Sequence, residues 1–334
     1  MKKNLLLMIS ALLLMLSACG QSEKAVSNGK QDSEEKLQKV TLMLDWYPNA
    51  VHSFLYVAEE KGYFKEQGLD VEIQMPADTN DPLRLVAADK IDMAISYQPQ
   101  VLVARGEDIP VVSFAALVRH PLNQLMVPTN GDIQSPKDLE GKSIGYPSIP
   151  LNEAIIQTMI ESDGGKYDKV KMVDVGWDLI PAIATKNTDA LIGAYINHEK
   201  LLLEKEGHPV RTINPVDYGV PDYYELVLVA SENALKENAD VFKKFIAAIT
   251  KGQNDVVEHP KEALSILLNH ENQSSPLDED IESKSLEMLL PLMHSNNQPF
   301  GYQDPSTWEN VAQWLYETKV IKKKATAEEA FINL

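Results

Sequence analysis

The sequence contains a single cysteine, Cys19, so no disulfide can form within the chain. Its longest apolar stretch, Leu5–Leu16, is shorter than the roughly twenty residues that a membrane-spanning helix needs. Several common catalytic and nucleotide-binding signatures are missing, among them Gly-x-Ser-x-Gly, His-Glu-x-x-His, the Walker loop and Gly-x-Gly-x-x-Gly. The sequence therefore excludes a disulfide-built scaffold and gives no positive sign of catalysis.

Basic side chains are also in the minority. The chain has 31 Lys and Arg against 49 Asp and Glu, which gives a formal net charge of −18. Such an acidic chain repels phosphate backbones and anionic lipid heads, so we do not expect nucleic acid as a partner. The seven histidines show no spacing typical of metal ligands, and we expect neither a metal nor another cofactor.

The N-terminus has the pattern of an export signal. Lys2 and Lys3 precede the apolar stretch, and the small residues Ser17 and Ala18 lead to Cys19. A lone cysteine at this position resembles the lipobox of bacterial lipoproteins, in which the thiol is acylated. We therefore predict a signal peptide over residues 1–18 and a lipid anchor on Cys19, which would hold the protein on the extracytoplasmic face of the cell membrane. An ordinary signal peptide or an uncleaved anchor is the alternative.

Residues 19–37 are polar and charged, with few large apolar side chains, and this composition predicts a flexible tether. Beyond it, short apolar runs alternate with helical patterns. Strands are expected at 40–44, 70–74, 92–96, 110–117, 142–146, 171–175 and 190–194. Helices are expected at 51–66, 82–88, 98–106, 150–162, 179–186 and 197–207. The alternation is typical of parallel sheets covered by helices. After residue 233 the pattern is mostly helical.

About 300 folded residues are more than one hydrophobic core usually supports, so we expect two α/β lobes. The apolar segments 124–127 and 225–230 each leave one α/β unit for the other, and we interpret them as two hinge strands. This interpretation gives a first lobe of residues 38–123 plus 231–334 and a second lobe of residues 124–230.

Polar and aromatic residues are crowded where the predicted strands end, which is where open α/β sheets bind ligands. The clusters are Asp45–His52, Ser96–Gln98, Tyr146–Ser148, Gly176–Asp178 and Tyr195–Glu199. Aromatic faces allow a flat ring to stack, and neighbouring amides and acids can bond to its edge. The clusters therefore favour a small flat heterocycle as the ligand.

The same clusters are similar to those of the thiamine-pyrimidine family of solute-binding proteins, from about Val40 to Lys251. The similarity is sharpest in Trp46-x-Pro48-Asn49-x-x-His52 and Asn197-x-Glu199. The block Lys61–Leu69 is shared with wider relatives that bind sulfonates, nitrate or riboflavin. The resemblance implies a type II periplasmic-binding-protein fold that captures a formylated aminomethylpyrimidine and delivers it to the permease of an ABC importer. We expect a monomer that performs no chemistry.

The expected ligand-binding set is Trp46, Asn49, His52, Tyr97, Tyr146, Tyr195, Asn197, Glu199 and Tyr223. Trp46 would stack on the pyrimidine, and Glu199 would accept a hydrogen bond from its exocyclic amine. Packing is the alternative for Trp46 and His52, helix capping for Asn49, and a solvated first helical turn for Glu199. One of the three tyrosines at positions 97, 146 and 195 is expected to be structural only.

Three other functions stay open. The same fold could bind riboflavin, hydroxymethylpyrimidine or an aliphatic sulfonate, although the clusters contain no Lys or Arg for a sulfonate. The family also includes a fungal pyrimidine synthase, which carries a Lys and a sacrificial His in the segment matched here by Ser96–Gln100, and a cysteine cluster at Asp217–Leu228. None of those groups is present, which argues against synthesis. A purely structural surface lipoprotein is the third possibility.

Overall fold

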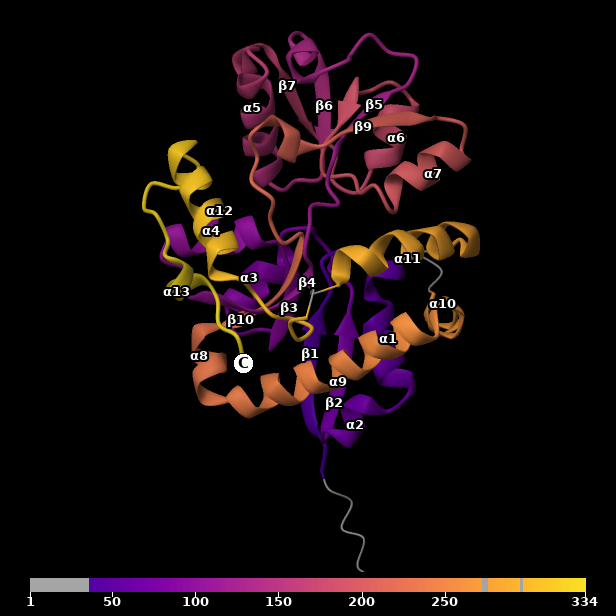
Figure 1. The fold of residues 1–334 in the computed structure, drawn as a ribbon, viewed down its shortest axis with the longest axis vertical. Coiled ribbons are helices and arrows are strands. Elements are labelled where there is room, and N and C mark those ends of the chain that lie inside the picture. The colour runs from indigo at the N-terminus through magenta and orange to yellow at the C-terminus, as the bar shows by residue number, and fades with distance from the viewer. Residues whose placement is uncertain (1–35, 272–275, 295–296) are drawn as a thin grey trace, which may run out of the picture. The chain divides into compact units, whose positions relative to one another are not determined.

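Two five-stranded mixed sheets organise the part of the chain that the computed structural model describes, residues 36–271, 276–294 and 297–334 (Figure 1). These residues form one unit, Lys36–Leu334. The predicted signal peptide, Cys19 and the predicted tether up to residue 35 lie outside the described residues. No helix within the described ranges is both long enough and apolar enough to cross a membrane.

The first sheet has the strand order β2-β1-β3-β10-β4. Its strands are β1 (Gln38–Met43), β2 (Leu69–Gln74), β3 (Met93–Ser96), β4 (Val111–Val118) and β10 (Leu226–Ser231). β1 is parallel to β2 and β3, whereas β10 is antiparallel to both β3 and β4. Every residue of β3, β4 and β10 is buried, as expected for strands that are covered on both faces, although β4 is the last strand in the order.

The second sheet has the strand order β7-β6-β8-β5-β9. Its strands are β5 (Leu125–Pro128), β6 (Ser143–Tyr146), β7 (Lys171–Asp174), β8 (Ala190–Leu191) and β9 (Val210–Ile213). β6 is parallel to β7 and β8, and β5 is antiparallel to β8 and β9. In each sheet, therefore, one antiparallel strand is inserted beside the strands of a parallel α/β unit.

Helices connect and cover the strands. Those in the first half of the chain are η1 (Ala50–His52), α1 (Ser53–Glu60), α2 (Tyr63–Glu66), α3 (Asp81–Ala87), α4 (Gln98–Gly106), η2 (Pro136–Leu139), α5 (Leu151–Ser162) and η3 (Tyr167–Lys169). Those that follow are α6 (Leu179–Ala184), α7 (Glu199–Lys205), η4 (Pro215–Tyr218), α8 (Glu232–Glu237), α9 (Ala239–Glu258), α10 (Pro260–Asn269), α11 (Glu279–Met293), α12 (Pro305–Glu317) and α13 (Ala327–Ala330). The helical C-terminal third predicted from the sequence is confirmed.

The longest helix among the described residues, α9, packs along α1 through a very close contact (Figure 1). Phe242, Phe245 and Val256 point from α9 into the core and are buried. A Cβ atom at Gly252 would lie only 2.2 Å from the backbone oxygen of Phe54, so only glycine permits this approach. The close packing of the two helices fixes α1 and the site residues that precede it.

The structure corrects three element predictions. The helix expected at 51–66 is divided into η1, α1 and α2, because Gly62 adopts a left-handed conformation with φ of 76° and ends α1. The strand expected at 190–194 is only β8, since Gly193 has φ of 88°. The segment 225–230, interpreted as a hinge strand that completes the second lobe, is instead almost entirely β10 and is paired within the first sheet.

Candidate functional site

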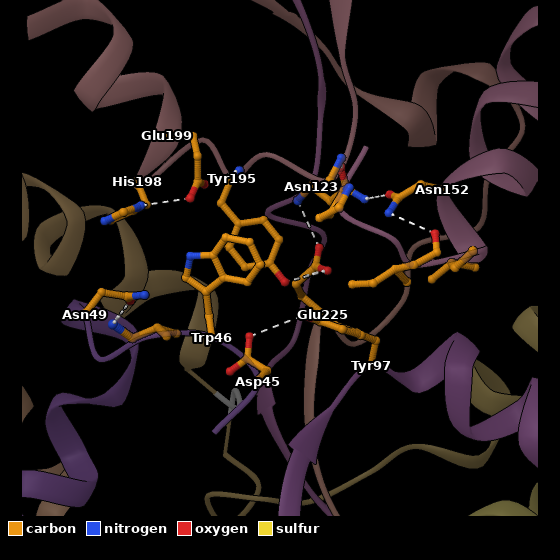
Figure 2. Close-up of a pocket in the computed structure, with 15 residues that line it drawn as sticks. Asp45, Trp46, Asn49, Tyr97, Asn123, Asn152, Tyr195, His198, Glu199 and Glu225 are labelled. Carbon is orange, nitrogen blue, oxygen red and sulfur yellow. Dashed lines mark hydrogen bonds and ion pairs between the residues drawn. The ribbon is translucent and has the colours of Figure 1, made fainter. Parts of the chain in front are cut away.

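A pocket lies where strands of both sheets end (Figure 2). Residues that follow β1, β3, β6 and β8 line it, together with residues of the two segments that cross between the sheets. The lining residues are Asp45, Trp46, Asn49, Val51, Tyr97, Asn123, Pro147, Ile149, Leu151, Asn152, Gly193, Tyr195, His198, Glu199 and Glu225. This is the position at which α/β sheets bind ligands.

Glu225 lies where the two crossing segments meet. Its Oε2 accepts hydrogen bonds from the backbone N–H groups of Leu122 and Asn123, at 2.7 and 2.9 Å. The Tyr223 hydroxyl donates to Oε2 at 3.4 Å, and the Tyr195 hydroxyl donates to Oε1 at 3.2 Å. Burial raises the pKa of Glu225 to about 7, although these donors oppose the rise. This carboxyl group can therefore be neutral or charged near neutral pH.

Asp45 follows β1 and is held by two buried neighbours. His52 Nε2 lies 3.0 Å from its Oδ1, and the Tyr97 hydroxyl donates to its Oδ2 at 3.3 Å. The backbone N–H of Asn49 donates to His52 Nδ1 at 3.3 Å, so Nε2 of the neutral ring carries the proton and donates to Asp45. The orientation of the Asp45 carboxyl group is therefore fixed before any ligand arrives.

Glu199 and His198 form a second buried acid-containing pair at the start of α7. Nδ1 of His198 lies 2.9 Å from Oε1 of Glu199, and the backbone N–H of Tyr195 donates to Oε2 at 2.8 Å. Burial opposes charge on both groups, but their mutual attraction and hydrogen bond prevail, so the pKa of Glu199 is lowered and that of His198 is raised. Glu282 of α11 lies 3.7 Å from His198 Nε2.

A network of amide groups forms another part of the lining. The Asn123 side chain donates to Asn152 Oδ1 at 2.9 Å, and the backbone N–H of Gly193 donates to Asn123 Oδ1 at 2.6 Å. A Cβ atom at Gly193 would lie 2.4 Å from Pro147 Cδ, so glycine is needed here both for space and for its positive φ. The network joins the crossing segment before β5 to α5 and to the loop after β8.

Aromatic rings from both sheets meet beside the pocket. The Trp46 and Trp177 rings are 4.1 Å apart between centroids and are inclined by 41°. Tyr47 lies 5.5 Å from Trp46 and meets the His198 ring edge-on at 5.4 Å. Trp177 belongs to the loop between β7 and α6 and is 37% exposed. The cluster links the loop after β1 with the loop after β7.

The structure brings five of the nine predicted ligand-binding residues to the pocket: Trp46, Asn49, Tyr97, Tyr195 and Glu199. Asn49 lines the pocket and also caps η1, because its side chain accepts a hydrogen bond from the backbone N–H of Val51. The half-buried Trp46 is one of these five lining residues, so its ring is not confined to the core.

The other four predicted residues are not part of the lining. His52 and Tyr223 are fully buried behind it, bonded to Asp45 and Glu225 respectively. Asn197 donates instead to the Ser285 hydroxyl of α11, at 2.9 Å. Tyr146 points toward α5, where its hydroxyl donates to Glu153 at 2.9 Å.

Sequence reasoning missed the lining residues Asn123, Asn152 and Glu225, and it left Asp45 and His198 without a role. Asp45 and His198 lie inside the clusters of polar and aromatic residues at the ends of the predicted strands, so the sequence did indicate that they are near the site. Asn123 and Glu225 lie in the crossing segments, which come together only through the pairing of strands far apart in the chain. No local pattern marks them.

The electrostatic character of the pocket is acidic. Its lining includes the carboxyl groups of Asp45, Glu199 and Glu225, and among the described residues that line it none is Lys or Arg. His198 is the single imidazole of this lining. An anionic ligand would therefore meet no Lys or Arg in the described lining, and the imidazole of His198 is already paired with the Glu199 carboxylate.

Away from the pocket, three side chains at the end of α9 have the residue types of a metal site. Asp255, Glu258 and His259 place one potential ligand atom each within 4.8 Å of one another. Asp255 already accepts a hydrogen bond from the Tyr63 hydroxyl at 2.5 Å and pairs with Lys61 at 3.3 Å. We interpret the group as part of a surface charge network.

Comparisons with known proteins identify the family of the chain and support its fold. The family model described as "NMT1/THI5 like" matches residues 49–263. The chain is 45% identical over its full length, and over 99% of the other chain, to a formylaminopyrimidine-binding protein of Halalkalibacterium halodurans. It is 27% identical to a 4-amino-5-hydroxymethyl-2-methylpyrimidine phosphate synthase of Saccharomyces cerevisiae, over 77% of this chain and 78% of that one.

Among solved structures, the alkanesulfonate-binding protein SsuA from Xanthomonas axonopodis pv. citri superposes with a TM-score of 0.70 and 11% identity. The alignment covers 89% of this chain and 98% of that chain. This likeness confirms the predicted α/β fold of the periplasmic-binding-protein type. The family match and the full-length identity together establish that the chain belongs to the NMT1/THI5-like family.

Proposed function

We propose that the chain is an extracytoplasmic solute-binding lipoprotein of an ABC importer, and that its ligand is N-formyl-4-amino-5-aminomethyl-2-methylpyrimidine, taken up for thiamine synthesis. One observation carries this proposal: the pocket combines aromatic rings with buried hydrogen-bond acceptors, and none of its described lining residues is Lys or Arg. The relative from H. halodurans, which is named a formylaminopyrimidine-binding protein, supports the choice of ligand.

The chemistry of an aminopyrimidine fits these side chains. Its exocyclic amine offers N–H donors, and the Glu199 carboxylate, whose pKa is lowered, accepts hydrogen bonds only. Trp46 and Tyr195 supply ring faces for stacking at the lining. The Trp46 indole N–H is buried without a partner among the described residues, and an acceptor on the ligand would remove the cost of that unmade bond.

Capture would work through the position of the pocket between the sheets. A ligand that touches residues of both sheets favours the arrangement in which the sheets lie together, in proportion to its greater affinity for that arrangement. We propose residues 38–123 plus 226–334 and residues 124–225 as the two moving lobes, and we move the boundary predicted at residue 230 because β10 is paired within the first sheet. The closed monomer would then be the form that docks on the permease.

The lipid anchor is a separate part of the proposal. Cys19 would carry the lipid after removal of residues 1–18, and residues 19–37 would tether the binding unit to the membrane. Replacing Cys19 by Ser should move the exported protein from the membrane fraction to the soluble fraction. A variant that stays in the membrane fraction would indicate an uncleaved anchor instead.

The two main alternatives find less support in the pocket. An imine-forming synthase needs a lysine, yet in the segment Ser96–Gln100 the Ser96 hydroxyl simply donates to the Gln100 side-chain oxygen at 3.3 Å. A sulfonate would favour basic side chains, and the described lining has no Lys or Arg. Helix N-termini also favour a sulfonate, but the start of α7 at the lining already carries the Glu199 carboxylate. The synthase relatives are also much less similar than the binding protein.

Titration calorimetry of the purified protein tests the proposal. The formyl compound should bind with one-to-one stoichiometry, while riboflavin and taurine should produce no binding heat. Heat from riboflavin or taurine, without heat from the formyl compound, would overturn the choice of ligand and leave the importer role. Formation of a pyrimidine product on incubation with pyridoxal phosphate and iron would favour the synthase.

A further inference from the structure

Glu225 differs from Glu199 in the nature of its partners. Glu199 is paired with His198, whose pKa is raised, whereas Asp45 is bonded to the neutral ring of His52 and to the Tyr97 hydroxyl. The partners that the structure gives Glu225 are two backbone N–H groups and two tyrosine hydroxyls, all of them uncharged. Glu225 is therefore a pocket carboxyl group without a cationic partner in the described part of the chain.

The geometry also leaves Glu225 able to accept a further hydrogen bond. Three of its four donors bond to Oε2, whereas Oε1 receives only the Tyr195 hydroxyl, at 3.2 Å. A carboxylate oxygen has capacity for more than one donor. The side chain lines the pocket but is only 3% exposed, so a positive group placed beside it would interact in a poorly screened environment.

We propose that Glu225 binds a positively charged group of the ligand, so that the pocket accepts the deformylated compound 4-amino-5-aminomethyl-2-methylpyrimidine, as its ammonium form, and rejects pyrimidine phosphates. This inference rests on the proposed function, because it assumes that the pocket recognises the aminopyrimidine ring. It names a second ligand class for the site and gives Glu225 the role of selecting ligand charge.

Protonation of Glu225 makes the selection dependent on pH. With a pKa of about 7 Glu225 is mostly neutral at pH 6, and an ammonium ligand must displace that proton. An aliphatic ammonium itself stays protonated between pH 6 and 8, as lysine does. Binding of the amine should therefore tighten as the pH rises through this range and should release a proton near pH 6.

Besides Glu225, the titratable groups that line the pocket are those of Asp45, Tyr97, Tyr195, His198 and Glu199, and Tyr223 bonds to Glu225 from behind the lining. Tyr97, Tyr195 and Tyr223 have pKa values raised well above 10 by burial and by nearby carboxylates, so they stay neutral. Loss of the His198 proton at higher pH would also favour a cation, and Glu282 beside it has a pKa raised by burial. The variant His198→Asn separates this contribution from that of Glu225.

Titration calorimetry of the whole purified protein at pH 6, 7 and 8 tests the inference with three probes. They are the formyl compound, the free amine and 4-amino-5-hydroxymethyl-2-methylpyrimidine phosphate. The dissociation constant of the amine should fall about tenfold from pH 6 to pH 8, since each pH unit below the pKa reduces the ionised fraction about tenfold. The dissociation constant of the uncharged formyl compound should change much less, and the phosphate should not bind.

Glu225→Gln should weaken amine binding at pH 8 at least about tenfold. When it is combined with His198→Asn, it should abolish most of the pH dependence of amine binding that remains in His198→Asn alone. Asp222→Asn is the matched control, because Asp222 is an exposed carboxylate of the same crossing segment, paired with His120 outside the pocket. Its dissociation constants should equal those of the wild type. If Glu225→Gln does not fold, the calorimetry of the three probes with the wild-type protein still tests the inference.

The outcomes separate this inference from the proposed function. Binding of the formyl compound without binding of the amine at any pH overturns the inference and leaves the proposed function intact. Binding of the phosphate, or amine binding that Glu225→Gln leaves unchanged, also overturns it. If none of the three pyrimidines binds, the proposed function itself fails.

Discussion

Glu199 is the pocket residue whose charged state is best supported. It receives a backbone N–H from Tyr195 and lies 2.9 Å from His198 Nδ1. Burial would favour its neutral form, but the neighbouring imidazole and these hydrogen bonds lower its pKa. A ligand therefore meets a carboxylate that is already oriented and ionised at neutral pH.

Replacing Glu199 by Gln removes the charge while nearly preserving the shape of the side chain. We expect binding of the formyl compound to weaken by about 1.5–3 kcal/mol, the usual contribution of a hydrogen bond to a charged group. Calorimetry measures this change directly. Glu204→Gln is the control on the same helix, since Glu204 is exposed, pairs with Lys200 and lies outside the pocket. An unchanged dissociation constant for Glu199→Gln would remove Glu199 from the ligand contacts.

The His198–Glu199 pair should also make stability depend on pH. The raised pKa of His198 stabilises the fold fully below its ordinary value of 6.5, and this contribution is lost as the pH rises through the folded-state value. The lowered pKa of Glu199 stabilises the fold above its ordinary value of 4.5, and this contribution is lost on acidification. The pair therefore contributes most between pH 4.5 and 6.5.

His198→Asn should accordingly lower the free energy of unfolding most in that window, and the difference from the wild type should shrink at pH values above it. Urea unfolding at pH 5.5 and at higher pH measures the two differences. The exposed His208 provides a comparison, because His208→Asn should have little effect at either pH. A constant difference for His198→Asn would show that the imidazole acts only by packing.

At the scale of elements, the contact between α1 and α9 positions the first part of the site. η1 and α1 follow directly after Asp45, Trp46 and Asn49, so any displacement of α1 moves these residues. The displacement is opposed by the buried aromatic and aliphatic face of α9 and by the close approach at Gly252. Substitutions at this contact, which is remote from the pocket, should therefore affect the free energy of unfolding more than they affect ligand binding.

Gly252→Ala should destabilise the protein even though alanine favours a helix by about 1 kcal/mol over glycine. The added Cβ atom would lie 2.2 Å from the Phe54 oxygen, which forces the two helices apart. We expect a net loss of about 1–3 kcal/mol in the free energy of unfolding, as for other overpacked cores. Asn254→Ala, at an exposed position of α9, should be neutral or slightly stabilising in the same denaturation experiment. A stabilised Gly252→Ala variant would show that the helices separate freely.

Sequence reasoning could predict the elements but not their assembly. Helix 98–106 and strand 171–174 lie almost where the hydrophobic periodicity places them, because that pattern is local. The direction and sheet of β10 do not follow from its own residues, since an all-buried strand has the same apolar run in either direction. Glu225, which directly precedes β10, was missed as a pocket residue for this reason.

The residues that follow β1, β3 and β8 were predictable as site residues because the α/β alternation fixes where strands end. Tyr146 was expected on the same ground, yet it is the last residue of β6 and its side chain points to Glu153, because a residue at the end of a strand can face either side of the sheet. The rotamer and the packed neighbours of a side chain decide which way it points, and the hydrophobic pattern of the sequence specifies neither.

At the scale of the whole molecule, a ligand that binds only the folded state must raise the stability of the entire unit. The formyl compound at 100 times its dissociation constant should add about 2.7 kcal/mol to the free energy of unfolding. Thermal denaturation should therefore shift upward with ligand concentration, whereas an equal concentration of taurine should leave the midpoint unchanged. An unshifted midpoint at saturating ligand would mean that the folded protein does not bind the compound.

The placement of β10 has a consequence for the order in which the chain can fold. β10 fills the gap between β3 and β4, where Val227 is paired with Ser96 and Ala116. All strands of the second sheet, within residues 125–213, are synthesised before it. Until β10 arrives, β3 and β4 each keep an edge of unpaired main-chain groups, which is a template for aggregation. A chain that ends at residue 225 should therefore aggregate when purified, although it still contains all five strands of the second sheet.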